Sequence, residues 1–466
     1  MTYQFDLVVI GSGSGLDVAV AAAQYGLKVA VIEKGSLGGT CLNRGCIPSK
    51  MLIHSADILE TISRAHLFGI KVKGYQVDFG SIVGRVIRDV DSDSEKIEQS
   101  LMKVRNPFLF KKQARFVDHK TLQVGNDKVR AEKILIASGS RPKIPEIKGL
   151  KNSNFITSDE ALRLKTQPEV LTILGGGYIA VELAHFFGTL GTKINIVQHH
   201  NFLVPKEDEE ISKIFTAIFK AKYNVFLGFE PKEVIKSGDD FEVLIESRED
   251  GRAETLKSDQ LLVAAGRIPN SDVLDVQKTD VKVGCDGKIL VDEYLETNVE
   301  GIFALGDVVG HYPFKHSANL EAGYALNNIL NSDNKIPVDY TAMPHGIFSS
   351  PQIASVGKTE QQLRANKSHY LVGRYNYVDT AMGSAIEDRT GFVKLLVDEH
   401  TRKIVGCHIL GADATTLIHE VLVAMKSGEG VIENITRTVH IHPALSEVVH
   451  RAALNLRSTL IKPNSY

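Results

Sequence analysis

Two segments of the chain repeat one order of apolar and polar positions. Residues 5–34 read FDLVVIGSGSGLDVAVAAAQYGLKVAVIEK, and residues 169–200 read EVLTILGGGYIAVELAHFFGTLGTKINIVQHH. Each has an apolar run typical of a strand, a cluster of glycines, an amphipathic helical run, a further glycine and a second apolar run. This order predicts a β-α-β dinucleotide-binding unit, and its repetition predicts two nucleotide sites.

The glycines of the two repeats have distinct physical tasks. Gly11 permits the tight turn after the first strand, and Gly13 leaves room for a diphosphate to approach the backbone. Gly175 and Gly177 occupy the same positions in the second repeat. The helix that follows presents amide groups and the positive end of its dipole to the diphosphate. The third small position of the pattern is taken by Leu16 in the first repeat, which departs from the pattern there.

The second strands of the two repeats end differently. Glu33 ends the first, and Gln198 ends the second. A carboxylate at this position binds the hydroxyls of an adenosine ribose, so Glu33 favours an unphosphorylated ribose, as in FAD or NAD. The neutral Gln198 does not repel a 2′-phosphate, and the bases His199, His200 and Lys206 follow it. NADPH is therefore allowed at the second site and NADH is not excluded, and a solvated loop explains the two histidines equally well.

Three later apolar runs also end in glycine. They are residues 133–142 (KILIASGSRP), 260–270 (QLLVAAGRIPN) and 297–310 (TNVEGIFALGDVVG), and the last contains Asp307. Together they predict that the chain leaves the first nucleotide-binding domain, forms the second, and then returns to the first.

From about Tyr340 the pattern changes. Residues 391–410 read as a two-stranded hairpin, and residues 413–428 as a helix with one buried stripe at Ile418, Val421, Leu422 and Met425. We therefore predict an α/β fold with two Rossmann-like dinucleotide-binding domains and a C-terminal α+β dimerisation domain. The predicted ranges are 1–145 for the first nucleotide-binding domain, 146–270 for the second, 271–339 for the return to the first, and 340–466 for the dimerisation domain.

Composition narrows the classes of function. The 466 residues are 43% hydrophobic and 24% charged, and their net charge of −2 gives no reason to expect nucleic acid or an anionic membrane as a partner. No apolar stretch approaches the roughly 20 residues that span a bilayer. The first strand begins almost at the N-terminus and leaves no room for a targeting peptide, so we expect a cytoplasmic protein.

Cys41 and Cys46 are two of only 4 cysteines in the chain. A zinc site needs about four ligands, and neither Cys285 nor Cys407 has a second ligand at metal spacing, so we expect no metal. A disulfide needs Cα atoms within about 7 Å, which the spacing allows only on a distorted helical turn where Gly45 gives local freedom. Such a bond closes a short loop, stabilises weakly and is labile. The pair is therefore predicted to be redox-active.

The segment GGTCLNRGCIPSK, residues 38–50, resembles the active-site segment of the FAD-dependent pyridine nucleotide–disulfide oxidoreductases, and the resemblance extends over nearly the whole chain. This family includes dihydrolipoamide dehydrogenase and the glutathione, mycothione and mercuric reductases. The resemblance implies that Cys46 lies against the flavin and that Cys41 exchanges with the substrate. It also implies that Lys50 lies near flavin N5, with Glu182 as its carboxylate partner.

The same resemblance assigns the cofactor sites. For FAD it implies Gly11, Gly13, Gly15, Glu33, Lys34, Gly39, Thr40, Ser138, Gly139, Gly306 and Asp307. For NAD or NADP it implies Gly175, Gly177, Tyr178, Ile179, Gln198, His199 and Gly266, with Tyr178 placed as a lid over the nicotinamide pocket.

The C-terminal segment HIHPALSEVVH, residues 440–450, contains a candidate acid–base pair. Pro443 fits the first turn of a helix, which would place His442 just before the helix and Glu447 in its second turn. A histidine oriented by a carboxylate is a poised acid and base near neutral pH. The resemblance implies that His442 and Glu447, rather than His440, serve the active site of the partner subunit, so the working site requires a homodimer.

Within the family, the last residues LIKPNSY contain no cysteine pair, unlike mercuric reductases and the large thioredoxin reductases. Both active-site cysteines are present, unlike in peroxidase, oxidase and transhydrogenase relatives. CLNRGCIPSK and HPALSE are most similar to dihydrolipoamide dehydrogenase, whose substrate is the lipoyl domain of a multienzyme complex. GGGYIAVE resembles glutathione reductase, and YNYVDTAMGSAIED resembles mycothione reductase. We therefore expect a dihydrolipoyl dehydrogenase, with an NADPH-dependent reductase of a small disulfide as the alternative.

Overall fold

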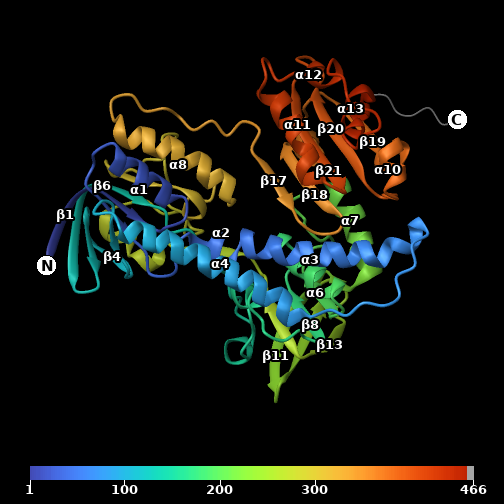
Figure 1. Ribbon diagram of the computed structural model, residues 1–466, viewed down its shortest axis with the longest axis horizontal. Coiled ribbons are helices and arrows are strands. Elements are labelled where there is room, and N and C mark those ends of the chain that lie inside the picture. The colour runs from blue at the N-terminus through green and yellow to red at the C-terminus, as the bar shows by residue number, and fades with distance from the viewer. Residues whose placement is uncertain (459–466) are drawn as a thin grey trace.

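The computed structural model describes residues 1–458. Figure 1 shows the N-terminal sheet at one end, a second nucleotide-binding sheet below the centre and the C-terminal sheet at the upper right. Two long helices, α3 (Cys46–Arg64) and α4 (Phe79–Met102), run between these parts. Within residues 1–458, no helix has the length and apolar character needed to cross a membrane.

The first sheet has the strand order β3-β2-β1-β6-β5-β4, and β16 also pairs with β6. β1 is parallel to both β2 and β6, and α1 connects β1 to β2, as the first repeat predicts. β16 is parallel to β6, so the chain returns to this sheet after forming the second one. The bounds are β1 Thr2–Ile10, α1 Gly15–Gln24, β2 Val29–Ile32, β3 Phe108–Phe110, β4 Ala114–Asp118, β5 Thr121–Val124, β6 Asp127–Ile136 and β16 Ile302–Ala304.

The second sheet is parallel and has the order β10-β9-β8-β14, with α6 between β8 and β9. An antiparallel sheet, β11-β12-β13, lies in the chain between β10 and β14, and β7 pairs with β15. The bounds are β7 Ser140–Pro142, β8 Val170–Leu174, α6 Tyr178–Thr189, β9 Lys193–Gln198, α7 Glu209–Lys222, β10 Asn224–Leu227, β11 Phe229–Ser237, β12 Asp240–Ser247, β13 Ala253–Ser258, β14 Gln260–Val263 and β15 Arg267–Pro269. The two Rossmann-like units of the predicted fold are confirmed.

The C-terminal sheet is antiparallel, with the order β17-β18-β21-β20-β19-β22. Its strands β20 and β21 form the predicted hairpin, and α11 packs against β18 and β21. In α11, Ile418 and Val421 are buried, while Leu422 and Met425 are partly buried, as the stripe predicts. The bounds are β17 Pro344–Ile347, β18 Gln352–Gly357, α9 Glu360–Ala365, β19 Tyr370–Asn376, α10 Ala381–Ala385, β20 Phe392–Asp398, β21 Ile404–Gly411, α11 Ala414–Lys426, α12 Glu433–Thr436, α13 Glu447–Leu454 and β22 Leu456–Ser458.

Helix α3 is held by its apolar face against α6. Leu52, Ile53 and Ala56 of α3 belong to one core cluster with Phe186 and Phe187 of α6. Full burial of a side chain of this size stabilises by about 1.5–3 kcal/mol. This packing fixes the start of α3, which carries Cys46, relative to the start of α6.

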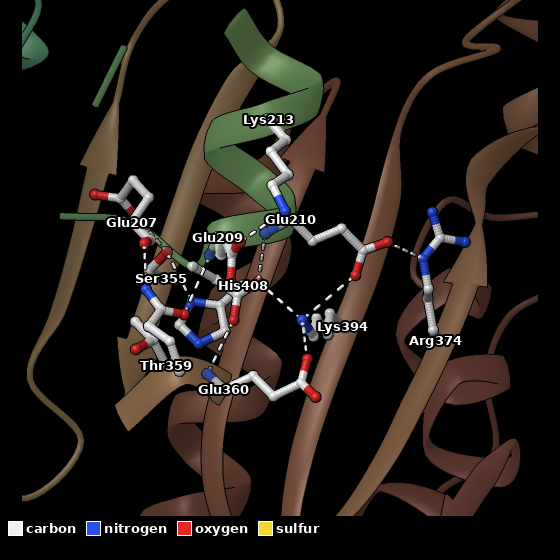
Figure 2. Close-up of polar contacts among 12 residues, drawn as sticks. Glu207, Glu209, Glu210, Lys213, Ser355, Thr359, Glu360, Arg374, Lys394 and His408 are labelled. Carbon is white, nitrogen blue, oxygen red and sulfur yellow. Dashed lines mark hydrogen bonds and ion pairs between the residues drawn. The ribbon is translucent and has the colours of Figure 1, made fainter. Parts of the chain in front are cut away.

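A buried ion network joins the N-terminus of α7 to the C-terminal sheet (Figure 2). The Nζ atom of Lys394, on β20, lies 2.8 Å from Asp208, 3.3 Å from Glu210 and 2.6 Å from Glu360. The side chain of Lys394 is 3% exposed, and that of Asp208 is fully buried. One cation is thus shared by three carboxylates from two elements distant in sequence.

A second buried pair lies beside this network. Glu207 contacts His345 at 2.7 Å and accepts a 2.7 Å hydrogen bond from Ser355. Burial opposes the ionisation of Glu207, but the hydrogen bond and charge of His345 outweigh it and lower the pKa of Glu207. Burial likewise opposes protonation of His345, yet Glu207 raises the pKa of that imidazole.

The pair makes a pH-dependent contribution to stability. The stabilisation that comes from the Glu207 carboxylate is fully present above pH 4.5, the ordinary pKa of a glutamate. It is lost as pH falls through the folded-state pKa, because that pKa is depressed. The stabilisation that comes from the protonated His345 ring is fully present below pH 6.5, the ordinary pKa of a histidine. It is lost as pH rises through the folded-state pKa, because that pKa is raised. We expect the Tm deficit of His345→Gln to be largest between about pH 4.5 and 6.5 and to shrink on both sides. A flat deficit, or an equal one for exposed His54→Gln, would contradict this expectation.

Candidate active site

The two cysteines lie on consecutive short helical segments. Cys41 belongs to α2 (Gly39–Arg44), and Cys46 is the first residue of α3. Gly45 separates the helices with φ −144° and ψ −120°, and a Cβ there would lie 2.8 Å from a backbone oxygen. The break at Gly45 therefore brings the two side chains together where a continuous helix would separate them.

Both cysteines are thiols in this structure, and their side chains share a hydrogen bond. That bond, donated by Cys41, is the largest influence on Cys46 and lowers its pKa to about 6, assisted by the charge of Lys50. The same bond, together with burial, raises the pKa of Cys41. The thiolate of the reduced pair is thus Cys46, and Cys41 needs a base before it can attack a disulfide.

Lys50 lies one helical turn after Cys46 and pairs with α6. Its Nζ donates a 2.8 Å hydrogen bond to Glu182, whose other oxygen accepts one of 2.9 Å from the backbone N–H of Phe348. The ammonium group also lies 4.8 Å from the centre of the Phe348 ring. Phe348 has no counterpart in the sequence prediction, because it comes from a loop that only the tertiary fold brings here.

The two charges act on Cys46 with opposite signs. Lys50 lowers the pKa of Cys46, and Glu182 raises it. We therefore expect Lys50→Met to raise the apparent pKa of this thiol above about 6, and Glu182→Gln to lower it. Thiolate absorbance of the reduced protein, followed against pH, measures both shifts. Shifts of the same sign in the two variants would refute this electrostatic account.

The first glycine loop is shaped by close approaches. At Gly11, with φ +104°, a Cβ would lie 2.3 Å from the oxygen of Ala137, whereas nothing lies within 4 Å of a Cβ at Gly13. A Cβ at Gly15 would meet Ala137 and Val9 at 2.8 and 2.9 Å. Gly15 therefore provides the close helix–strand packing of the third small position, and Leu16 packs against the neighbouring core instead. The departure at Leu16 is compensated one residue earlier.

The remaining residues assigned to FAD lie around this loop. Glu33 accepts hydrogen bonds from the N–H and hydroxyl of Ser12 at 3.0 and 2.8 Å, at the end of β2. Asp307 accepts a 2.5 Å hydrogen bond from Ser140. The Oγ atom of Ser138 is buried and has no hydrogen-bond partner among residues 1–458. The other assigned positions are exposed Lys34, half-buried Thr40, and the three glycines with positive φ, Gly39, Gly139 and Gly306.

These features fit a dinucleotide such as FAD. An open glycine loop at a helix N-terminus accepts a diphosphate, a carboxylate at the end of β2 suits ribose hydroxyls, and Ser138 has an unused hydroxyl. Gly39 adds a further constraint, because a Cβ there would lie 2.8 Å from the Cα of Gly13. The segment carrying Cys41 is thereby packed directly on the diphosphate loop.

The second glycine loop has the same form. A Cβ at Gly175, with φ +121°, would lie 2.3 Å from a backbone oxygen, and nothing lies within 4 Å of one at Gly177 or Gly266. Tyr178 and half-buried Ile179 follow as the first residues of α6. Burial raises the pKa of Tyr178 to about 12, so it stays a neutral phenol. The charges that act on it include those of Cys46 and Glu182, which places the second loop beside the cysteine pair.

Basic side chains gather at the end of β9. Gln198 is buried there, and the rings of His199 and His200 lie 4.0 Å apart. Arg248 donates a 3.4 Å hydrogen bond to the carbonyl of His199, and exposed Lys206 lies further along the chain. Burial and the charges of His200 and Arg248 lower the pKa of His199. Sequence reasoning missed Arg248, because the antiparallel β11-β12-β13 sheet brings it from a distant part of the chain.

The C-terminal histidine pair forms within one chain, but not as predicted in its local structure. His442 Nδ1 lies 3.1 and 3.2 Å from the two oxygens of Glu447, and the His442 side chain is 71% exposed. The helix begins at Glu447, with Ser446 as its N-cap. The prediction that Pro443 starts this helix is wrong, because bends at 442–443 and a turn at 445–446 come before its first residue.

His440 is committed to a different contact. Its Nε2 pairs with Glu420 of α11, its ring stacks 4.4 Å from that of His450, and its side chain is 7% exposed. The His442 ring is therefore accessible to a second subunit or a substrate, whereas the His440 ring is largely covered. In Figure 1, α13 lies in the upper, C-terminal part of the molecule, and α2 lies near the centre.

The chain is similar to known proteins over nearly its whole length. The family model described as pyridine nucleotide-disulphide oxidoreductase matches residues 5–401. Mycothione reductase of Mycobacterium tuberculosis is 35% identical over 464 residues, covering 97% of this chain and 99% of its own. Mitochondrial dihydrolipoyl dehydrogenase 2 of Arabidopsis thaliana is 36% identical over 463 residues, covering 96% and 90%.

A solved structure agrees with these matches. The HOCl-induced flavoprotein disulfide reductase RclA of Escherichia coli superposes with a TM-score of 0.84 at 28% identity, covering 97% of this chain and 99% of its own. The predicted disulfide oxidoreductase function, with FAD and NAD or NADP as cofactors, is confirmed at this level. The chain belongs to the pyridine nucleotide-disulphide oxidoreductase family.

Proposed function

We propose that Cys41 and Cys46 form the redox-active disulfide of this flavoprotein and exchange electrons with a small dithiol or disulfide. The observation that carries the proposal is the hydrogen-bonded thiol pair at the break between α2 and α3, with Lys50 one turn after Cys46 and paired with Glu182 of α6. The first glycine loop, Glu33, Ser138 and Asp307 would hold FAD, which would supply electron transfer between the nicotinamide and the cysteine pair. Tyr178 covers the nicotinamide pocket at the second loop.

The exchange with a disulfide substrate balances as follows. The Cys41 thiol gives its proton to His442 of the partner subunit, and the thiolate attacks one substrate sulfur to form a mixed disulfide. The released thiolate takes the proton from that imidazolium. The Cys46 thiolate then attacks the Cys41 sulfur, which forms the intrachain disulfide and releases the second substrate thiolate. The substrate gains two electrons and the cysteine pair loses two; dithiol oxidation is the reverse.

A homodimer supplies the base in this scheme. His442 is exposed in the single chain, and the apolar side chains beside it, Val439 and Ile441, are 95% and 79% exposed. Val423 and Leu454, on α11 and α13, are also exposed. Exposed apolar groups on the segment that carries an oriented imidazole, and on the helices α11 and α13, suit burial against a second copy. The division into domains 1–145, 146–270, 271–339 and 340–466 is part of the same proposal.

For the substrate, we propose dihydrolipoamide with NAD as acceptor. The support is the local likeness of residues 38–50 to dihydrolipoyl dehydrogenases and relatives of that name at 33–36% identity. Initial rates with NAD or NADP and dihydrolipoamide, and with NADH or NADPH and lipoamide, glutathione disulfide or mycothiol disulfide, test this assignment. Turnover confined to NADPH and a small disulfide would reject it. A protein whose flavin neither nicotinamide reduces would reject the oxidoreductase mechanism itself.

A second candidate is an NADPH-dependent reductase of a low-molecular-weight disulfide. The observation in its favour is the cluster of His199, His200 and Arg248 at the neutral end of β9. Under this candidate, we expect Arg248→Met to raise the KM for NADPH by about tenfold, because a charge-assisted contact to the 2′-phosphate is lost. The KM for NADH should stay unchanged. An equal change in the KM values for NADPH and NADH would show that Arg248 does not bind the 2′-phosphate.

A further inference from the structure

Lys315 is a cation that packs on the first glycine loop. It is half-buried at the start of α8 (Lys315–Leu330). Its Nζ donates a 2.8 Å hydrogen bond to the hydroxyl of Ser14, which donates in turn to Asn319 at 2.9 Å. Within residues 1–458, no carboxylate forms an ion pair with Lys315. A half-buried ammonium group held only by a neutral hydroxyl favours a nearby site where negative charge develops.

The contacts of the first glycine loop place that site at Cys41. Ser14 follows Gly13, and a Cβ at Gly39 would lie 2.8 Å from the Cα of Gly13. Cys41 lies two residues after Gly39 on α2. Lys315 and the segment that carries Cys41 therefore pack on adjacent residues of one loop, and the charge of Lys315 lowers the pKa of Cys41.

The two sulfurs thus have separate cations. Lys50 acts on Cys46 and is largely neutralised by Glu182. Lys315 acts on Cys41, against burial and the charge of Cys46, both of which disfavour a thiolate at Cys41. In the proposed holoenzyme dimer, two further charged groups are expected near this site. They are the FAD diphosphate at the first glycine loop, which also faces Lys315, and the imidazole of the partner subunit's His442.

We propose that Lys315 stabilises the Cys41 thiolate that attacks the substrate disulfide. This role rests on the exchange chemistry proposed above. Lys315 neither gives nor takes a proton in it: the proton passes from Cys41 to the partner's His442, and the ammonium charge lowers the free energy of the thiolate left behind. Lys315 is thus a positioning residue that acts through charge on the attacking sulfur.

Alkylation of the reduced holoenzyme tests the proposal without turnover. Arg44 lies between the two cysteines, so trypsin places Cys41 and Cys46 on separate peptides and mass spectrometry follows each one. The rate of reaction with iodoacetamide, measured from about pH 6 to 10, tracks the thiolate fraction of each cysteine. The variants are Lys315→Met, Lys315→Arg, Lys50→Met and the exposed control Lys151→Met.

In Lys315→Met we expect the Cys41 profile to move to higher pH, with alkylation at pH 7 slowed about tenfold, a shift of about one pH unit. Lys315→Arg should retain the parent profile, Lys151→Met should change neither cysteine, and Lys50→Met should move mainly the Cys46 profile. An unchanged Cys41 profile in Lys315→Met overturns the proposal. So does loss of bound flavin in Lys315→Met with Cys41 alkylated as in the parent, because the lysine would then serve the cofactor.

The two levels of proposal fail separately. If the wild-type protein turns over no disulfide or dithiol with either nicotinamide, the proposed function fails, and the assignment of Lys315 to catalysis fails with it even where the alkylation shift appears. If the wild type turns over substrate and Lys315→Met alkylates normally, only the role of Lys315 is lost.

Discussion

Replacement of His442 by glutamine is expected to slow turnover with a disulfide or dithiol by about 10²- to 10⁴-fold, the usual range for loss of a general acid–base group. The structure gives the physical reason. Cys46 holds the negative charge of the reduced pair, so Cys41 remains protonated until a base removes its proton. Flavin reduction by the nicotinamide does not use this base and should keep its rate, as stopped-flow absorbance will show. A matched loss in both half-reactions would contradict the assignment.

Mixed dimers test whether the base comes from the other subunit. Cys41→Ser and His442→Gln homodimers should each be inactive, because every site lacks one member. Random mixing of the two chains yields half hybrids, each with one intact site of two, so activity should recover to about a quarter of the wild-type value in a two-fold symmetric dimer. A Cys41→Ser/His442→Gln double variant mixed with itself is the control. No recovery, with hybrid formation verified by two affinity tags, would reject a shared site.

The sequence predicts well those features that depend on short-range patterns. The two glycine loops, the return strand β16 and the β20-β21 hairpin all appear where the runs of apolar residues and glycines place them. These patterns report local backbone requirements, such as the positive φ at Gly11 and Gly175, which few other residues satisfy. The contact between Lys50 and Glu182 came from the family resemblance, since nothing local in either helix indicates it.

The features that the sequence did not predict depend on contacts between distant segments. Arg248 reaches the end of β9 from an antiparallel sheet, and Lys315 reaches Ser14 across 301 residues. The prediction that Pro443 starts the helix was wrong because a turn at residues 445–446 follows the proline and the helix begins only at Glu447. The ion network of Lys394 was also invisible, because a lysine within an apolar strand pattern reads as a solvated position until the fold places three carboxylates around it.

Lys394 leads to the largest expected loss of stability. Burial opposes the charge of Lys394, but Asp208 and Glu360 outweigh it and raise the pKa of this lysine. The charge of Lys394 therefore stabilises the fold fully below pH 10.5, the ordinary pKa of a lysine. This stabilisation is lost only as pH rises through the raised pKa of the folded state. At neutral pH the cation is fully present. Its removal would leave buried carboxylates without a counter-charge.

Replacement of Lys394 by methionine is expected to lower the free energy of unfolding by about 3–5 kcal/mol, the usual cost of removing one partner of a buried ion pair. Lys213→Met is the matched control. Lys213 pairs with Glu209 at 2.6 Å on the exposed rim of the same network, where its side chain is 53% exposed, and the loss there should stay below about 1 kcal/mol. Chemical denaturation of the holoenzyme, fitted over the transition of the C-terminal part, measures both.

If Lys394→Met destabilises the protein because carboxylates are left without a counter-charge, two further results are expected. The double variant Lys394→Met/Asp208→Asn should be less destabilised than Lys394→Met alone, because it removes a fully buried carboxylate that has lost its cation. The deficit of Lys394→Met should also shrink as pH falls toward 4, where the unpaired carboxylates take up protons and become neutral. If the double variant is the less stable of the two, or if the deficit is independent of pH, then Lys394 contributes through the packing of its aliphatic stem in the sheet. The network would then hold the nucleotide-binding and C-terminal parts together through packing, and its charges would add no net stability.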